Sequence, residues 1–94
     1  MTGSEIERGM REYAESFGGI LYKFVSPGRR GVPDRILVMP WRHPVFIEVK
    51  GDGDNLSSIQ IREINRLLKL GQEVHVIRSL TEGISTINHI RESV

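Results

Sequence analysis

The sequence contains no cysteine, which excludes disulfide bonds, thiolate zinc sites and a thiol nucleophile. Its apolar runs are far shorter than the roughly 20 residues of a membrane-spanning helix. The first ten residues, MTGSEIERGM, carry charges and lack the apolar segment of a signal peptide. With 94 residues, 38% hydrophobic and 27% charged, we expect one globular domain over residues 1–94. We expect it in the cytoplasm, with no membrane partner and no organic cofactor.

The charge is small in sum but unevenly distributed. The net charge is +1, yet the segment from Lys23 to Lys50 holds six basic residues against two acidic ones. That segment therefore carries +4 and the remainder −3. A local positive field suits a polyanionic ligand, although a solvated basic face explains the same pattern equally well.

The hydrophobic pattern predicts an α/β fold with elements in the order α-β-β-β-α-β-α. The expected helices cover residues 4–17, 57–70 and 81–92, and the expected strands cover residues 20–25, 34–39, 45–50 and 73–77. Three consecutive strands favour an antiparallel meander. The second helix then acts as a crossover that places the fourth strand parallel to the third, giving a mixed sheet flanked by helices.

Local signals set the helix ends and faces. Ser4 with Glu7, and Ser57 with Gln60, have the spacing of a capping box, and glycines follow the first two helices. The expected core faces of the second and third helices consist of Ile61, Ile64, Leu67 and Leu68, and of Leu80, Ile84, Ile87 and Ile90.

Three charged residues are expected to meet at one end of the sheet. Glu48 and Lys50 share a face of the third strand because side chains alternate along a strand. Asp34 begins the neighbouring strand, directly after Pro33. If residues 34–39 and 45–50 form a hairpin, the start of the first lies beside the end of the second.

Two adjacent carboxylates repel each other unless one is protonated or a cation lies between them. Mg²⁺ or Mn²⁺ suits oxygen ligands, and the carbonyl of Val49 offers a third oxygen. Such a metal polarises a phosphodiester and activates water, while Lys50 holds that water and stabilises the transition state. The alternative is a cross-strand ion pair at a wet sheet edge.

These residues resemble the signature of the PD-(D/E)XK nuclease superfamily, with Pro33-Asp34 followed by Glu48-Val49-Lys50. The wider pattern is similar to the VRR-NUC branch, the virus-type replication-repair nucleases. The segments that carry the resemblance are Gly18-Gly19, Tyr22-Lys23-Phe24, residues 26–34 (SPGRRGVPD), residues 46–50 (FIEVK), Gln60, Gly71 and residues 76–79 (VIRS). The resemblance implies a restriction-endonuclease-like core with a divalent metal site. It also implies kinship with junction-resolving enzymes that act as homodimers.

The resemblance also implies roles for single residues. Asp34 and Glu48 match the metal ligands and Lys50 the catalytic lysine. Gln60 matches the glutamine at the start of the next helix, a role compatible with capping. The acid of the first helix best matches Glu7, with Glu5 as the alternative. Only one arginine, Arg78, stands where the family has Val-Arg-Arg, so its role stays open.

Other residues are candidates for DNA or subunit contacts. The expected phosphate-binding cations are Lys23, Arg29, Arg30 and Arg35. Trp41 could stack on a base, pack at a subunit interface or cover the core edge. The apolar side chains that exceed the needs of a small core are Tyr22, Phe24, Trp41 and the isoleucines of the last helix.

The resulting hypothesis is a Mg²⁺- or Mn²⁺-dependent endonuclease that cuts branched DNA, most naturally a four-way junction, as a homodimer. One domain offers one site, whereas two symmetric cuts need two. The alternatives are a flap or duplex nuclease within a larger complex, a DNA-binding module that cuts nothing, and a protein-interaction domain.

Overall fold

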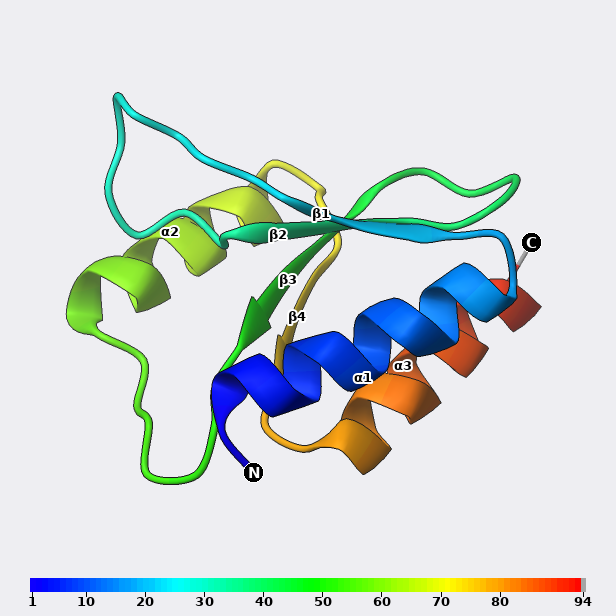
Figure 1. Cartoon of the computed structure of the whole chain (residues 1–94). Coiled ribbons are helices and arrows are strands. Elements are labelled where there is room, and N and C mark those ends of the chain that lie inside the picture. The colour runs from blue at the N-terminus through cyan, green and yellow to red at the C-terminus, as the bar shows by residue number, and fades with distance from the viewer. Residues whose placement is uncertain (94) are drawn as a thin grey trace.

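The computed structural model describes residues 1–93, which form a four-stranded sheet with helices on both faces (Figure 1). The helices are α1 (Gly3–Ser16), α2 (Ser58–Lys69) and α3 (Leu80–Glu92), and the strands are β1 (Ile20–Lys23), β2 (Arg35–Val38), β3 (Val45–Val49) and β4 (Val74–Ile77). This order confirms the predicted one, and every predicted end lies within two residues of the observed one. Within the described residues, no helix has the length and apolarity needed to cross a membrane.

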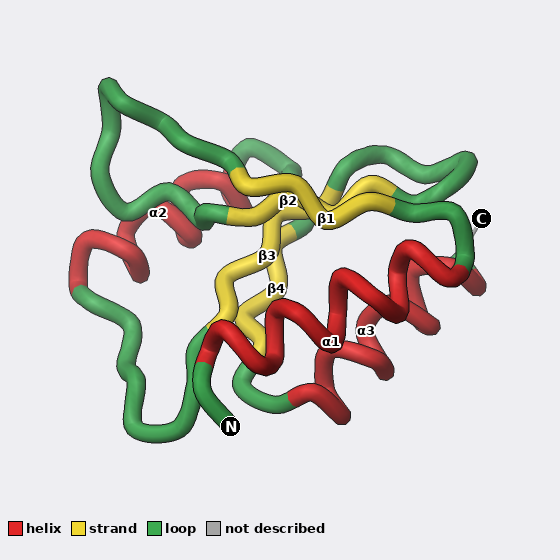
Figure 2. Tube along the Cα trace, in the orientation of Figure 1, coloured by secondary structure: helices red, strands yellow, loops and turns green. Residues whose placement is uncertain are grey.

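The sheet has the spatial order β1-β2-β3-β4 (Figure 2). β1 pairs antiparallel with β2 and β2 with β3, whereas β4 runs parallel to β3. The parallel pair is joined through α2, because strands that run in the same direction need a crossover connection. The mixed sheet predicted from the sequence is therefore confirmed.

The main core lies between the sheet and the pair α1 and α3, which cover the same face (Figure 1). Gly83 lets these helices approach, since a Cβ there would lie 2.6 Å from Met10 Cγ. The fully buried side chains include Ile6, Met10, Ala14, Val45, Ile47, Ile87 and Ile90. Ile87 and Ile90 thus belong to the core, as the helical pattern predicted. The suggestion that they are spare apolar surface for a subunit contact is wrong, because the packing of α1 against α3 buries them.

The opposite face of the sheet carries α2 alone. Ile64 of α2 is buried, but Ile61 and Leu68 are 47% and 49% exposed. The prediction that both face the core is wrong. A helix without a neighbouring helix is covered along only one narrow arc, and these two side chains lie at its margin.

The helix starts correct one prediction and confirm another. α1 begins at Gly3, and its capping box is formed by Thr2 and Glu5, not by Ser4 and Glu7. Both pairs have the same spacing, but the cap at Thr2 lets the helix begin two residues earlier than a cap at Ser4 would, and it leaves the Glu7 carboxylate available to Arg35. For α2, the predicted capping box of Ser57 and Gln60 is confirmed.

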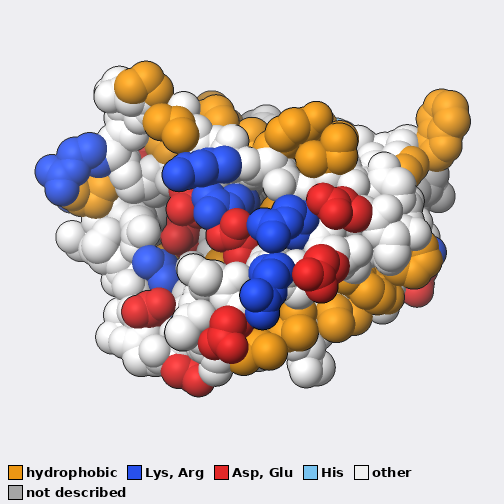
Figure 3. Space-filling view, in the orientation of Figure 1, with side chains coloured by type: hydrophobic (Ala, Val, Ile, Leu, Met, Phe, Trp, Pro, Cys, Tyr) orange, Lys and Arg blue, Asp and Glu red, His pale blue; other side chains and the backbone are white. Residues whose placement is uncertain are grey.

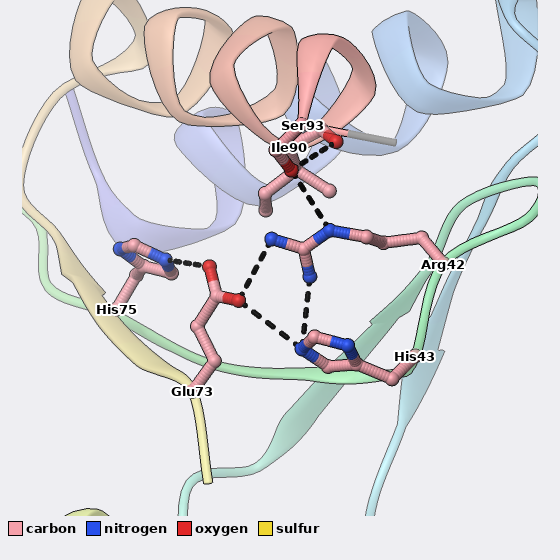
Figure 4. Close-up of polar contacts among 6 residues, drawn as sticks. All are labelled: Arg42, His43, Glu73, His75, Ile90 and Ser93. Atoms are coloured by element: carbon pink, nitrogen blue, oxygen red, sulfur yellow. Dashed lines mark hydrogen bonds and ion pairs between the residues drawn. The ribbon is translucent and has the colours of Figure 1, made fainter.

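A polar cluster fastens the sheet at the end where the β2–β3 turn meets the start of β4 (Figure 4). Glu73 lies at its centre, with Arg42 Nη2 2.9 Å from Oε1 and His75 Nε2 2.7 Å from Oε2. Arg42 also donates from Nε to the Ser93 hydroxyl at 2.9 Å. The cluster therefore joins the hairpin turn, β4 and the end of α3.

Candidate active site

Asp34, the residue before β2, lies opposite Glu48 of the neighbouring strand β3. The β2–β3 register pairs Arg35 with Ile47, and one step further along it places Asp34 across from Glu48. Both project from the sheet face that carries α2, because their neighbours Arg35 and Ile47 belong to the α1 face. The convergence expected from the hairpin is present.

Glu48 is a nearly buried carboxylate, with 5% of its surface exposed. Burial, and next the charge of Asp34, raise its pKa above the ordinary value, and the charges of Lys50 and Arg35 offset this only in part. Asp34 is more open, with 57% of its side chain exposed. The pair thus consists of an inner and an outer carboxylate in a site that favours an additional positive charge.

Lys50 stands directly after β3, on the same face as Glu48. Its Nζ lies 3.7 Å from Glu48 Oε2, and its side chain is 14% exposed. Its backbone N–H donates to the carbonyl of Ile77 at 2.8 Å, which fixes the chain at this point. The ammonium group is therefore held beside the inner carboxylate.

The donor set fits a hard divalent cation of limited protein coordination. The facing carboxylates of Asp34 and Glu48, with the backbone carbonyl of Val49, would supply oxygen ligands to such a cation, and Lys50 and Arg35 only partly offset the raised pKa of Glu48. Within residues 1–93 no group of three acidic or histidine side chains is assembled for a metal. Mg²⁺ commonly binds through one or two carboxylates and completes its shell with water and substrate phosphate, so this set suffices.

Glu7 reaches the site through Arg35. Arg35 Nη2 lies 2.5 Å from Glu7 Oε2, and Nη1 lies 3.4 Å from Asp34 Oδ2. Burial works against the charge of Arg35, yet the hydrogen bond to Glu7 and the nearby carboxylates raise its pKa. Glu5, the alternative acid, is engaged in the cap of α1. Of the two acids, Glu7 is the one beside the site.

The loop of residues 24–34 is fixed onto α2 (Figure 1). Arg29 Nε lies 3.0 Å from Glu63 Oε1, and Glu63 is only 6% exposed. Gly31 has φ +82°, and a Cβ there would lie 2.7 Å from the carbonyl oxygen of Ile59. Only glycine combines this conformation with so close an approach. These two attachments hold the chain that leads into Asp34.

The four expected DNA contacts differ in their surroundings. Arg29 and Arg35 have carboxylate partners, Glu63 and Glu7. Lys23 and Arg30 are exposed, and neither side chain forms an ion pair or hydrogen bond within the described part of the chain. In Figure 3, acidic side chains in the middle of the viewed face lie among Lys and Arg side chains. Acidic and basic side chains are thus interspersed on this face.

The remaining candidates are placed as follows. Gln60 is partly buried, and its Oε1 accepts from the Ser57 N–H at 2.9 Å, so the side chain is turned toward the start of α2. Arg78 donates to the carbonyl of Asp54 at 3.3 Å. Trp41 is 91% exposed with φ +61°, so the interpretation as a core-edge cover is wrong.

Sequence reasoning missed the buried carboxylate of Glu63 and its contacts with Arg29 and Arg66. Glu63 Oε1 also lies 3.3 Å from Arg66 Nε. The available signal was its position, since Glu63 falls on the same arc of α2 as the predicted core residues Ile64 and Leu67. A carboxylate on a buried arc needs a partner, and the arginine-rich loop supplies one.

Comparison with solved structures defines the class of protein. One structure described as a VRR_NUC domain superposes with a TM-score of 0.82 and 30% sequence identity, covering 95% of this chain and 98% of that one. A second, a VRR_NUC domain protein, shares the fold with a TM-score of 0.76 at 20% identity, over 98% of this chain and 89% of that one. The fold is that of a nuclease domain with a PD-(D/E)XK core.

Sequence comparison gives the family. A model of the VRR-NUC domain matches residues 11–80. The chain is 46% identical over 74 residues to "Putative nuclease p44" of Acyrthosiphon pisum secondary endosymbiont phage 1, covering 79% of this chain and 80% of the relative. The chain belongs to the VRR-NUC family, as the resemblance had indicated, and is a nuclease domain.

Proposed function

We propose that this protein is a divalent-metal-dependent, structure-specific DNA endonuclease that hydrolyses phosphodiester bonds in branched DNA as a homodimer. The observation that carries the proposal is the convergence of Asp34, nearly buried Glu48 and Lys50 at one end of the sheet. A cross-strand ion pair at a wet edge accounts less well for it, because Glu48 is 5% exposed.

Each residue of the set has a distinct task. Asp34 and Glu48 hold Mg²⁺ or Mn²⁺, which when bound supplies positive charge to the phosphate and a more acidic water. Lys50 donates a hydrogen bond to the attacking water or to a phosphate oxygen, and stabilises the negative charge that develops there. Water adds to phosphorus, one P–O bond to a sugar breaks, and the products are a phosphate monoester and a sugar hydroxyl.

Arg35 and Glu7 keep this set in place. Arg35 spans from Glu7 on α1 to Asp34 at the start of β2. Its guanidinium fixes the outer carboxylate, which is otherwise the more exposed member of the pair. The bound orientation of Asp34 then needs less ordering when metal and DNA arrive.

The dimer is supported by the part of the sheet that α2 leaves uncovered. α2 contacts β4, so the same face of β1 lacks a covering helix, and there Ile20 and Tyr22 are 44% and 52% exposed. β1 is also an edge strand with unpaired backbone groups. A second copy placed on β1 would bury these groups. It would also bring a second active site to the other DNA strand that has to be cut.

The test is a cleavage assay on a four-way junction, a flap, plain duplex and single strand, each with Mg²⁺, Mn²⁺ or EDTA. We expect metal-dependent cuts with preference for the junction, and paired cuts from a species that sediments as a dimer. Preference for flap or duplex would favour the simpler nuclease alternatives. Binding of DNA without cleavage under any metal would refute the enzymatic proposal.

Three variants make this assay specific. Glu48→Gln and Lys50→Ala should each abolish cleavage, by about 100-fold or more, with DNA binding retained. Glu92→Gln makes the same chemical change on the exposed end of α3 and should cut at the wild-type rate. Wild-type cleavage by Lys50→Ala would remove Lys50 from the reaction.

A further inference from the structure

The outer face of α2 carries three cations that the candidate active site does not use. Arg62, Arg66 and Lys69 are spaced four and three residues apart, so they lie on one side of the helix. Together with Asn65 they line an open hollow of about 390 Å³. Like charges at this spacing repel each other and weaken an isolated helix, so the arrangement favours an anionic partner. We call these three residues the α2 basic face.

Most of this positive charge is not neutralised by the protein. Within residues 1–93, Arg62 and Lys69 form no side-chain hydrogen bond or ion pair. Arg66 is 49% exposed and touches Glu63 through Nε, the inner nitrogen of its guanidinium. Its terminal nitrogens form no hydrogen bond or ion pair within the described residues.

Glu63 connects the α2 basic face with the loop that leads to the active site. Its buried Oε1 is shared by Arg29 of the loop and Arg66 of the helix, at 3.0 and 3.3 Å. One carboxylate thus orients two guanidinium groups and neutralises only one charge. The next loop residue, Arg30, adds a further exposed cation. Glu63 therefore joins the cations of the helix to those of the loop, and the loop leads along the chain into Asp34.

We infer that the α2 basic face binds the sugar–phosphate backbone of the substrate outside the scissile bond. The inference rests on the proposed function, because it takes DNA as the ligand. From Arg62 to Lys69 the helix advances about 10 Å, the length of roughly three nucleotide steps of duplex DNA. Phosphate contacts carry no sequence information, so this surface holds an arm of the substrate irrespective of sequence.

The experiment measures DNA affinity against salt for the double variant Arg62→Gln, Lys69→Gln. Both side chains lack partners in the described chain, and glutamine suits a helix, so the fold is retained. The log–log salt slope should fall by about 1.8 for a duplex arm, and KM should rise while kcat at saturating DNA stays unchanged. The charge-conserving pair Arg62→Lys, Lys69→Arg should keep the wild-type slope.

Single variants supply a matched control. Arg62→Gln and Arg8→Gln each remove one positive charge from an exposed helix position, on α2 and α1 respectively. The slope should fall by about 0.9 for Arg62→Gln alone. Equal slopes for the two, or an unchanged slope in the double variant of an active wild type, overturn the inference and leave the nuclease proposal intact. A wild type that neither binds nor cuts DNA overturns both.

Discussion

Glu73 offers a test of the structure that is independent of catalysis. Its carboxylate holds Arg42 of the hairpin turn and His75 of β4, and through Arg42 the end of α3 (Figure 4). We expect Glu73→Gln to lower the free energy of unfolding without changing the active site at the opposite end of the sheet. Glutamine keeps the size of the side chain and loses only its charge.

The magnitude follows from the pKa. Partial burial raises the pKa of Glu73, but the hydrogen bonds from His75 and Arg42 and the charge of Arg42 lower it by more. The net effect is a pKa of about 2 in place of the ordinary 4.5. At about 1.4 kcal/mol per pKa unit, the charged form gains up to about 3 kcal/mol in the folded state. With 24% of the side chain exposed, solvent screening reduces this to about 2 kcal/mol.

The sign gives the pH dependence. A carboxyl whose folded pKa is depressed stabilises the protein above its unfolded pKa, 4.5, and loses that contribution as pH falls through about 2. Wild type and Glu73→Gln should therefore differ most near neutral pH and converge in acid.

Urea unfolding followed by circular dichroism at several pH values measures this difference. With a slope of about 1 kcal/mol per molar urea, the midpoint of the variant should fall by roughly 2 M at neutral pH. Glu92→Gln, an exposed carboxylate without a partner in the described chain, should leave the midpoint in place. Equal midpoints for wild type and Glu73→Gln, or a difference that does not change with pH, would refute the reasoning.

Three further outcomes are expected. Asp34→Asn should lose about tenfold or more in Mn²⁺ affinity by calorimetry, and an unchanged affinity would exclude Asp34 as a ligand. Gly31→Ala should cost roughly 1–3 kcal/mol in urea unfolding, because of φ +82° and a clash with Ile59, whereas Gly28→Ala, with no atom within 4 Å, should be neutral. Glu7→Gln should lower kcat and leave the free energy of unfolding nearly unchanged. Glu5→Gln should lower the free energy of unfolding by about 1 kcal/mol, because the cap of α1 is lost, and leave kcat unchanged. The reverse pattern would make Glu5 the acid of the first helix that acts at the site.

The central site could be predicted because its determinants are local. Alternation along residues 45–50 fixes the face of Glu48 and Lys50, and a short hairpin fixes the register that brings Asp34 across. No distant segment has to be placed for this argument. The start of α1 was predicted wrongly, because Thr2 with Glu5 and Ser4 with Glu7 have the same capping spacing. Only the structure of the whole helix decides between the two pairs.

The rest of the site depends on contacts between distant segments. The burial of Glu63 requires that the loop near Arg29 fold back onto α2, more than 30 residues further along the chain. Exposure of Ile61 and Leu68 depends on how little of α2 the sheet covers. Neither follows from a hydrophobic pattern, since the pattern marks a helix face but not the width of the arc that is covered.

The arrangement of cations gives the charge distribution a rationale. Two arginines are tied to carboxylates outside the pair of Asp34 and Glu48, Arg35 to Glu7 and Arg29 to Glu63, so they are oriented but partly neutralised. Other exposed cations, among them Lys23, Arg30, Arg62 and Lys69, have no side-chain partner in the described chain. Paired guanidinium groups of this kind position the reacting groups and add little net attraction, whereas unpaired cations attract phosphates along the duplex. With a net charge of only +1, the protein therefore still presents unpaired cations to a polyanion, and Asp34 and Glu48 stay available for the metal that we propose.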